Sequence, residues 1–300
     1  MRATTAFAFI AGPLLALGSC APAAAQLVAA YPAGDCPDCA DWNAPQPAFR
    51  IFGNTYFVGT RGLSALLITS PRGHLLIDGG LPNSAPLIME NIAALGFDLS
   101  DVKLILNPHA HFDHAGGIAA LQRRSGARVA ASVPSAPVLE RGGSGPDDPQ
   151  YGALLAFPGV SPVERLADGQ VVSVGPISLT CHLTAGHTPG GTTWSWTSCE
   201  GAKCLNLVYA DSQTPVSAHG FEFSTSTTYP AAIADFERGF AVLDRLPCDV
   251  LITPHPAASS FWLRLEEGAD GLVDPGACRQ YSDSARRRLA RRLEAEGGGK

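Results

Sequence analysis

Residues 107–117 read NPHAHFDHAGG, a stretch in which four potential metal ligands fall within six positions. They are His109, His111, Asp113 and His114. The run directly before it, VKLIL at 102–106, is short and apolar except at Lys103, which predicts a buried strand. Because side chains alternate between the two faces of an extended chain, the first three ligands are expected to point to one side where the strand ends. His114 is expected where the chain turns into a helix at residues 115–117.

The ligand types indicate which metal this cluster suits. Imidazole nitrogens and carboxylate oxygens are common zinc ligands in proteins. Two of the histidines can hold one cation, and the Asp113–His114 pair can hold a second beside it. A polar surface loop is the alternative, but ligands at this density are unfavourable if they serve stability alone. Each zinc ion still needs ligands from elsewhere in the chain.

Two further histidines are candidates for the missing ligands. His187 lies in TAGHTPGG after the strand-like run 177–184, and His255 lies in LITPHP after the run 249–253. Both follow a strand, as the cluster does, and three strand ends at one edge would build a single site. The histidines that lack this context, and are expected not to bind metal, are His74 in a predicted hairpin, His182 pointing outward from its strand and His219 in a loop.

Strand-like and helix-like segments alternate along the rest of the chain, which favours β-sheets covered by helices on their outer faces. The other predicted strands lie in 49–59, 65–80 (with a turn at 71–73), 127–133, 169–174, 177–184, 192–198, 205–211 and 249–253. The predicted helices cover 84–96, 116–125, about 230–246 and 277–296, and a loop is expected over 141–163. The basic helix at 277–296 is expected to be a solvated surface element.

Length and charge exclude one class of partner. The chain has 300 residues, 46% of them hydrophobic, which is enough for a large core. Its 21 basic and 27 acidic residues give a net charge of −6, so the sequence shows no electrostatic footprint for nucleic acid. We expect no nucleic-acid partner; a monomer is favoured, and the expected partner is a small-molecule substrate.

The first 25 residues are expected to form a secretory signal. Arg2 is followed by an apolar run over 6–17 and by three alanines at 23–25, which predicts cleavage before Gln26 and a periplasmic protein. The alternative is a bacterial lipoprotein leader cleaved before Cys20, within LGSC, which would anchor the protein in the outer membrane. No later stretch reaches 18 consecutive apolar residues, so membrane contact is expected only through a lipid at Cys20.

Export changes how the cysteines are interpreted, because disulfides form in oxidising compartments. Beyond Cys20 the chain has seven cysteines, an odd number. The expected pairs are Cys199 with Cys204 and Cys248 with Cys278, while Cys181 is expected to be buried and free. Whether Cys36 and Cys39 are paired stays open; a zinc ribbon is excluded because the chain has no second CxxC.

The motifs HAHFDH, GHTPGG and TPHP together resemble the metallo-β-lactamase superfamily. Among its members the chain is most similar to class B β-lactamases of subclass B3, over nearly the whole of residues 26–300. The resemblance implies an α/β fold, an αββα sandwich of two mixed β-sheets flanked by helices, in a single domain over 26–300. It also implies a metal site at one edge, between the sheets.

The resemblance further implies two zinc ions and the residues that hold them. The first zinc would be held by His109, His111 and His187, and the second by Asp113, His114 and His255. Another subclass has a cysteine at the second zinc, whereas this chain has Ser212 in VYADS, which favours subclass B3.

The implied activity is hydrolysis of the β-lactam amide of penicillins, cephalosporins and carbapenems by a hydroxide shared between the zinc ions. Asp113 would orient that hydroxide, and Asp78 would support the ligand loop from behind. The residues expected to contact substrate are Gln150, Ser212 and Thr214. The chain departs from its relatives at Pro108, before the first ligand, and at Phe221, where some relatives have a tyrosine that assists the substrate carbonyl.

Two alternatives remain at this stage. A thioester or lactone hydrolase of glyoxalase II type has the same fold, and there an aspartate bridges the metals; Asp211 is the candidate. The predicted leader favours the lactamase. A non-catalytic zinc-binding or periplasmic adaptor protein is the other alternative, disfavoured by ligand sets that leave positions open for water.

Overall fold

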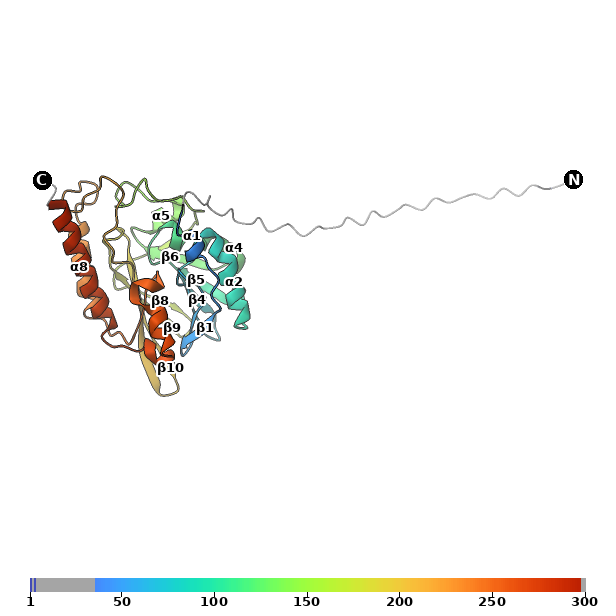
Figure 1. Ribbon diagram of the computed structural model, residues 1–300. Coiled ribbons are helices and arrows are strands. Elements are labelled where there is room, and N and C mark those ends of the chain that lie inside the picture. The colour runs from blue at the N-terminus through green and yellow to red at the C-terminus, as the bar shows by residue number, and fades with distance from the viewer. Residues whose placement is uncertain (2, 4–35, 298–300) are drawn as a thin grey trace.

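The computed structural model describes residues 1, 3 and 36–297 (Figure 1). Two mixed β-sheets are stacked between two helical layers, as expected for the αββα sandwich. In Figure 1, α8 lies at one side of the molecule and α2 and α4 lie at the other. Apart from residues 1 and 3, the predicted leader over 1–25, its alternative cleavage site at Cys20 and the mature start at Gln26 fall outside the described residues.

The first sheet has the strand order β1-β2-β3-β4-β5-β6-β7, antiparallel from β1 to β4 and parallel from β4 to β7. Its strands are β1 (Phe49–Phe52), β2 (Thr55–Phe57), β3 (Leu66–Ile68), β4 (His74–Ile77), β5 (Val102–Leu106), β6 (Arg128–Ser132) and β7 (Val163–Leu166). The predicted turn at 71–73 joins β3 to β4 as an antiparallel hairpin.

The second sheet has the order β12-β11-β10-β9-β8, antiparallel except for the parallel pair β11 and β12. Its strands are β8 (Val171–Val174), β9 (Ile177–Leu183), β10 (Thr192–Glu200), β11 (Lys203–Tyr209) and β12 (Val250–Ile252). Long β-branched and aromatic runs such as TTWSWTS in β10 suit a half-buried pleated strand.

The helices are α1 (Cys39–Trp42), α2 (Ala85–Ala94), α3 (Phe112–Ala115), α4 (Ile118–Ser125), α5 (Ala136–Arg141), α6 (Ala232–Leu243), α7 (Phe261–Glu266) and α8 (Ala277–Gly297). Short 3-10 turns lie at Pro82–Ser84, Leu99–Asp101, Pro256–Ser259 and Ala269–Leu272. Residues 142–162 contain no helix or strand, in agreement with the predicted loop.

Three apolar layers hold the sandwich together. Helices α2, α4 and α5 pack on the outer face of the first sheet; examples from this layer are Ile88, Leu121, Leu139, Leu76 and Ile105. The inner faces of both sheets meet in the central layer, with Ile77, Leu106, Trp194, Trp196 and Leu207 among its members. Helices α6 and α8 cover the second sheet through a third layer that includes Leu243, Tyr281, Val208 and Leu251.

Helix α8 is more than the solvated surface element expected from its charge. Its apolar side is buried against the second sheet and α6, at Cys278, Tyr281, Ala285 and Leu289. The arginines of the helix obscure this pattern because they dominate its composition. None of the helices that the structure describes combines the length and the apolar character needed for a membrane span.

Three disulfides and one free thiol are present in the described part of the chain. Cys199–Cys204 and Cys248–Cys278 are bonded as predicted, and Cys181 is free and fully buried. The open question is answered by a third bond, Cys36–Cys39. The Cys248–Cys278 bond joins the segment before β12 to the start of α8.

Aligned strand ends create the edge at which polar residues gather. In the first sheet Ile77 of β4 pairs with Leu106 of β5, and in the second Tyr209 of β11 pairs with Ile252 of β12. Strands β4, β5, β11 and β12 therefore all end at one edge of the sandwich. The predicted metal ligands come after β5, β9 and β12 in the chain.

Candidate metal centre

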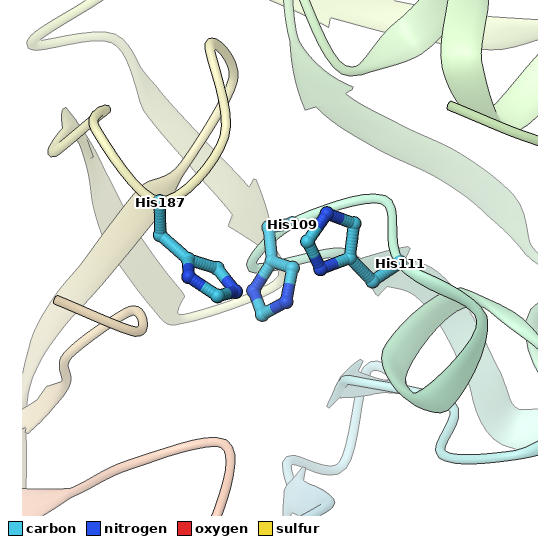
Figure 2. A group of neighbouring side chains, drawn as sticks. All are labelled: His109, His111 and His187. Atoms are coloured by element: carbon cyan, nitrogen blue, oxygen red, sulfur yellow. The ribbon is translucent and has the colours of Figure 1, made fainter. Parts of the chain in front are cut away.

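The first set of candidate ligands consists of three histidines. His109 and His111 follow β5, and His187 lies in the turn after β9. One ligand atom from each lies within 4.8 Å of the other two, and the ring centroids are 4.7 to 5.0 Å apart. All three side chains are buried. Figure 2 shows the three imidazoles gathered together, with His187 approaching from the opposite side of the group to His111.

The second set consists of Asp113, His114 and His255, in which three ligand atoms form a small triangle. Oδ2 of Asp113 lies 3.1 Å from Nε2 of His255 and 3.3 Å from Nε2 of His114. The two Nε2 atoms are themselves 3.3 Å apart. A carboxylate oxygen and two imidazole nitrogens that converge this closely are a donor set suited to one zinc ion. His109 also lies close to the second set, because its ligand atom and those of Asp113 and His114 are within 4.8 Å of one another.

Asp113 reaches the second set by a route that differs from the sequence prediction. The chain is extended at His111 (φ −91°, ψ 158°), but α3 begins at Phe112, before the predicted turn at 115–117. Asp113 therefore lies on a helix and does not share a strand face with His109 and His111. The N–H of Ala115 donates to the carbonyl of His111 at 2.8 Å, which closes this first helical turn.

Two glycine-containing segments, one after β4 and one after α3, pack closely and fix α3 against the end of β4. Gly79 donates its N–H to the carbonyl of His114 at 3.0 Å. A Cβ at Gly117 would lie 2.2 Å from the carbonyl oxygen of Gly79, so only glycine fits there. The GG that follows the histidine cluster is thus needed to seat the ligand helix on the first sheet.

Each of the three histidines in the first set is oriented by a hydrogen bond at one of its two ring nitrogens. These contacts are His109 Nδ1 to Asp211 Oδ1 at 2.7 Å, His111 Nε2 to Asp148 Oδ2 at 2.9 Å, and His187 Nδ1 to the carbonyl oxygen of Thr214 at 2.8 Å. Each bond occupies one ring nitrogen and leaves the other available for a cation, Nδ1 for His111 and Nε2 for its two neighbours. Such partners fix the tautomer and orientation of a metal-binding imidazole.

A buried network orients His114 in the second set. Oδ2 of Asp78 lies 2.9 Å from Nδ1 of His114 and accepts the Tyr209 hydroxyl at 2.7 Å. The same hydroxyl lies 3.2 Å from the carbonyl oxygen of Ser64. Because Asp78 follows β4 and Tyr209 ends β11, the network also joins the two sheets at the site edge. The contact agrees with the supporting role predicted for Asp78, whose φ of 75° is unusual for a residue other than glycine.

His255 is held differently from the other four. Within the described residues its Nδ1 has no hydrogen-bond partner, and its ring instead lies 5.0 Å from the ring of Trp42. Its side chain is 28% exposed, whereas that of His114 is fully buried. Trp42 ends α1, whose first residue is joined to Cys36 by the disulfide, so the N-terminal turn forms one wall of the second set.

Burial and neighbouring charges set the protonation of the metal-free site. Burial lowers the pKa of His109 well below its usual value, with help from the other histidines, and lowers the pKa of His187 to about 3. Burial also raises the pKa of Asp211 to about 7. Burial therefore disfavours the charged form of each partner in the contact between Asp211 and His109.

The second set has the opposite electrostatics. Burial acts to lower the pKa of His114, but the carboxylates of Asp113 and Asp78 outweigh it and hold that pKa well above its usual value. Burial acts to raise the pKa of Asp113, but His114 and His255 hold it well below its usual value. A cation in this set would take the place of the proton between an ionised carboxylate and two imidazoles.

Two of the three predicted substrate-binding residues, Gln150 and Thr214, contact His187 of the first set. The side-chain nitrogen of Gln150 is 3.5 Å from Nε2 of His187, the nitrogen that faces the ligand group. Thr214 contacts the same histidine, but through its carbonyl oxygen and not its hydroxyl. Ser212 is 7% exposed and follows Asp211. The histidines predicted not to bind metal lie elsewhere: Nδ1 of His74 is 3.4 Å from the Ser70 N–H, His182 bonds Ser195 at 2.8 Å, and His219 is exposed.

Sequence reasoning missed three residues of the site. Asp148 and Trp42 each contact a candidate ligand histidine, and Tyr209 bonds Asp78, which contacts another. None of the three belongs to a recognisable ligand pattern. A signal was available only for Asp148, which lies in DDPQY two positions before Gln150. A buried aspartate in a loop that already contains a predicted site residue is a candidate partner for a ligand.

The two sets fit a pair of zinc ions on chemical grounds. Imidazole and carboxylate donors converge in groups of three, which is the number that catalytic zinc sites use while keeping a position open for water. Four of the five histidines have their outer ring nitrogen engaged, as metal-binding histidines do. No cysteine takes part.

Comparison with known proteins agrees with this chemistry. Residues 58–200 match the model of the metallo-beta-lactamase superfamily. The solved structure of the Rm3 metallo-beta-lactamase is 57% identical, covers 87% of this chain and 99% of its own, and has a TM-score of 0.86. MEM-A1, a subclass B3 metallo-beta-lactamase from a soil metagenome library, is 50% identical, covers 87% of this chain and 100% of its own, with a TM-score of 0.84.

A shorter stretch of the chain is similar to a protein named for a different substrate, a lactone. The N-acyl homoserine lactonase AttM of Agrobacterium fabrum (strain C58 / ATCC 33970) is 36% identical over 89 residues, which is 26% of this chain. The matched segment spans about a third of that relative's length, 32%. This similarity is far less extensive than the similarity to the two solved structures.

Proposed function

The chain belongs to the metallo-β-lactamase superfamily, and on that premise we propose that it hydrolyses the amide bond of β-lactam antibiotics with two zinc ions. One observation carries the proposal: two three-ligand sets lie side by side in a fold that a β-lactamase shares at 57% identity. We assign the first zinc to His109, His111 and His187, and the second to Asp113, His114 and His255.

The zinc ions and the protein would divide the chemistry between them. When bound, zinc would polarise the lactam carbonyl and lower the pKa of a coordinated water to about 7, which supplies a nucleophile at neutral pH. Asp113 makes its described contacts through Oδ2, so Oδ1 is the oxygen that can accept a hydrogen bond from the attacking water. Asp113 is therefore both a ligand and the residue that orients the attack.

Gln150, Ser212 and Thr214 are proposed to bind the substrate around this centre. The amide of Gln150 faces the inner nitrogen of His187, a place from which it can donate to a substrate oxygen. The hydroxyls of Ser212 and Thr214 are proposed to contact the substrate carboxylate. The carbonyl of Thr214 already holds His187, so this residue can act on both the ligand and the substrate.

A lactone or thioester hydrolase is the second candidate, favoured by the partial similarity to AttM. In that mechanism Asp211 would bridge both metals. Its Oδ1 instead bonds the outer nitrogen of His109, and its Oδ2 lies against Gly191, where a Cβ would come within 2.4 Å. These contacts support a positioning role for Asp211 and therefore the lactamase.

Export to the periplasm is part of the proposal. Three disulfides in the described residues support folding in an oxidising compartment. Mass spectrometry of the protein recovered from a bacterial host would locate its first residue, expected at Gln26; a lipid-modified Cys20 would instead establish the membrane-anchored form.

Resistance in a susceptible bacterium tests the function directly. The full chain with its leader should raise the inhibitory concentrations of a penicillin, a cephalosporin and a carbapenem, and His187→Ala should abolish the effect. An inhibitor that traps a serine nucleophile should leave resistance intact, because no serine forms an acyl-enzyme here, whereas a zinc chelator should remove it. Unchanged susceptibility, with the protein exported and folded, would contradict the proposal.

A further inference from the structure

Asp148 makes two hydrogen bonds that connect different parts of the site. It lies in the loop between α5 and β7 and is 6% exposed. Its Oδ2 is 2.9 Å from Nε2 of His111, and its Oδ1 accepts the backbone N–H of Gln150 at 2.8 Å. One buried carboxylate thus contacts a candidate ligand with one oxygen and the backbone of a candidate substrate residue with the other.

We propose that Asp148 is a positioning residue that couples metal binding at the three-histidine set to the position of the loop carrying Gln150. The proposal rests on the proposed function only in taking His109, His111 and His187 to hold a metal ion. It assigns to this carboxylate a role in both metal affinity and the shape of the substrate wall.

The chemistry of the two contacts requires a carboxylate. The N–H of Gln150 is a donor, and His111 must carry its proton on Nε2 if Nδ1 is to face the metal, so both partners donate to Asp148. An asparagine of the same shape has only one acceptor atom. Its NH₂ group would have to face either the Gln150 N–H, which is a clash of two donors, or Nε2 of His111. The second arrangement favours the tautomer in which Nδ1 is protonated and cannot bind a cation.

The coupling extends to a second segment beside the site. We call the loop that carries Asp148 and Gln150 the first wall, and the segment between β11 and α6 the second wall. The segment between β11 and α6 contributes the Thr214 carbonyl that holds His187. The same segment donates the N–H of Ala218 to the carbonyl of Pro149 at 2.8 Å. The two walls are therefore bonded to each other next to Asp148, and each wall holds one histidine of the same set.

Linkage makes the effect reciprocal. If Asp148 and Thr214 hold the histidines in the geometry that binds metal, then bound metal must hold the two walls by the same free energy. A purely structural aspartate would stabilise its loop equally with and without metal. The two roles are thus separated by whether the order of the loop depends on zinc.

The experiment compares the full chain with two isosteric variants, Asp148→Asn and Asp147→Asn. Asp147 is exposed in the same loop, so its variant controls for the loss of one charge. Zinc is added to metal-free protein labelled with ¹⁵N-histidine, and the ring nitrogens report binding at each set separately. We expect Asp148→Asn to lower affinity at the three-histidine set about 10- to 100-fold, and to shift His111 away from its Nε2-protonated tautomer. Asp147→Asn should behave as the unaltered chain.

Hydrogen exchange provides the second measurement. In the unaltered chain zinc should slow exchange of the Gln150 and Ala218 amides, and in Asp148→Asn this zinc-dependent slowing should be lost. The proposal is overturned if Asp148→Asn binds zinc at the three-histidine set as tightly as the control. It is also overturned if zinc leaves both amides unchanged in the unaltered chain, a result that needs no variant to fold. Neither measurement uses a β-lactam, so a failure to hydrolyse one would refute the proposed function and leave this inference standing.

Discussion

Oδ1 of Asp211 lies 2.7 Å from Nδ1 of His109, on the side of the ring opposite the nitrogen that faces the ligand group. The aspartate therefore contacts the site from outside, as a partner of the candidate ligand His109. A bridging aspartate would have to turn an oxygen toward the metals, but Oδ2 packs against Gly191. This contact favours the proposed lactamase over the thioester hydrolase, in which Asp211 would bridge the metals.

Asp211→Asn should weaken zinc binding without abolishing it. The amide can still accept a hydrogen bond from His109, so the ligand is retained in a less fixed orientation, and we expect a loss of about 10- to 100-fold in affinity. Two zinc ions should still be found by metal analysis at saturating zinc. Loss of one or both ions under those conditions would identify Asp211 as a bridging ligand.

His187→Ala and His255→Ala should each remove most activity, because either change leaves an incomplete ligand set. His182→Ala and His219→Ala serve as matched controls, since His182 bonds Ser195 and His219 is exposed. Rates of nitrocefin hydrolysis and zinc content, measured on the same four preparations, check the assignment. Similar losses in all four variants would mean that the site is misassigned.

Zinc uptake at the second set should release a proton near pH 7. The pKa of His114 is raised above its usual value by Asp113 and Asp78, so its ring is protonated in metal-free protein and must lose the proton to bind zinc. His187, with a pKa of about 3, is already neutral and releases none. Affinity at the second set should therefore increase with pH, about tenfold per unit, until the pKa of His114 is passed. Calorimetry in buffers of different ionisation enthalpy measures this proton; its absence would contradict the charge assignment.

Tyr209→Phe should destabilise the fold and loosen the second set. The variant removes the hydroxyl that bonds Asp78 and the Ser64 carbonyl in a fully buried place, and we expect a loss of about 1–3 kcal/mol in the free energy of unfolding. Tyr151→Phe is the control, since Tyr151 is 53% exposed. Denaturant unfolding of metal-free protein compares the two. Equal stability of both variants would show that the network does not hold the sheets together.

Most strands and the four longest helices were predictable because local patterns encode them, and the same patterns pointed to the six candidate ligands. Strand β7 and helices α1, α5 and α7 were not predicted. Apolar runs such as VKLIL specify buried strands, and a histidine directly after such a run must emerge at the sheet edge. The route of Asp113 was not predictable, because α3 begins at Phe112 under the influence of a tertiary contact: the Gly79 N–H on the His114 carbonyl.

The outer partners of the ligands were mostly hidden from the sequence for the same reason. Asp148 is 37 positions from His111, and Tyr209 is 131 positions from Asp78, so no spacing rule connects them. Only Asp78 was anticipated, because it lies at the end of a strand-like run, as the candidate ligands do. Long-range contacts between loops are decided by how the two sheets stack, which no single segment specifies.

The most direct test of the whole account is hydrolysis by the purified, zinc-loaded protein. Nitrocefin, a carbapenem, S-lactoylglutathione and an N-acyl homoserine lactone are supplied in parallel, with and without a chelator. We expect rapid loss of both β-lactams, abolished by chelation and restored by added zinc, with little cleavage of the thioester or the lactone. Efficient cleavage of the thioester or the lactone, with both β-lactams left intact, would contradict it.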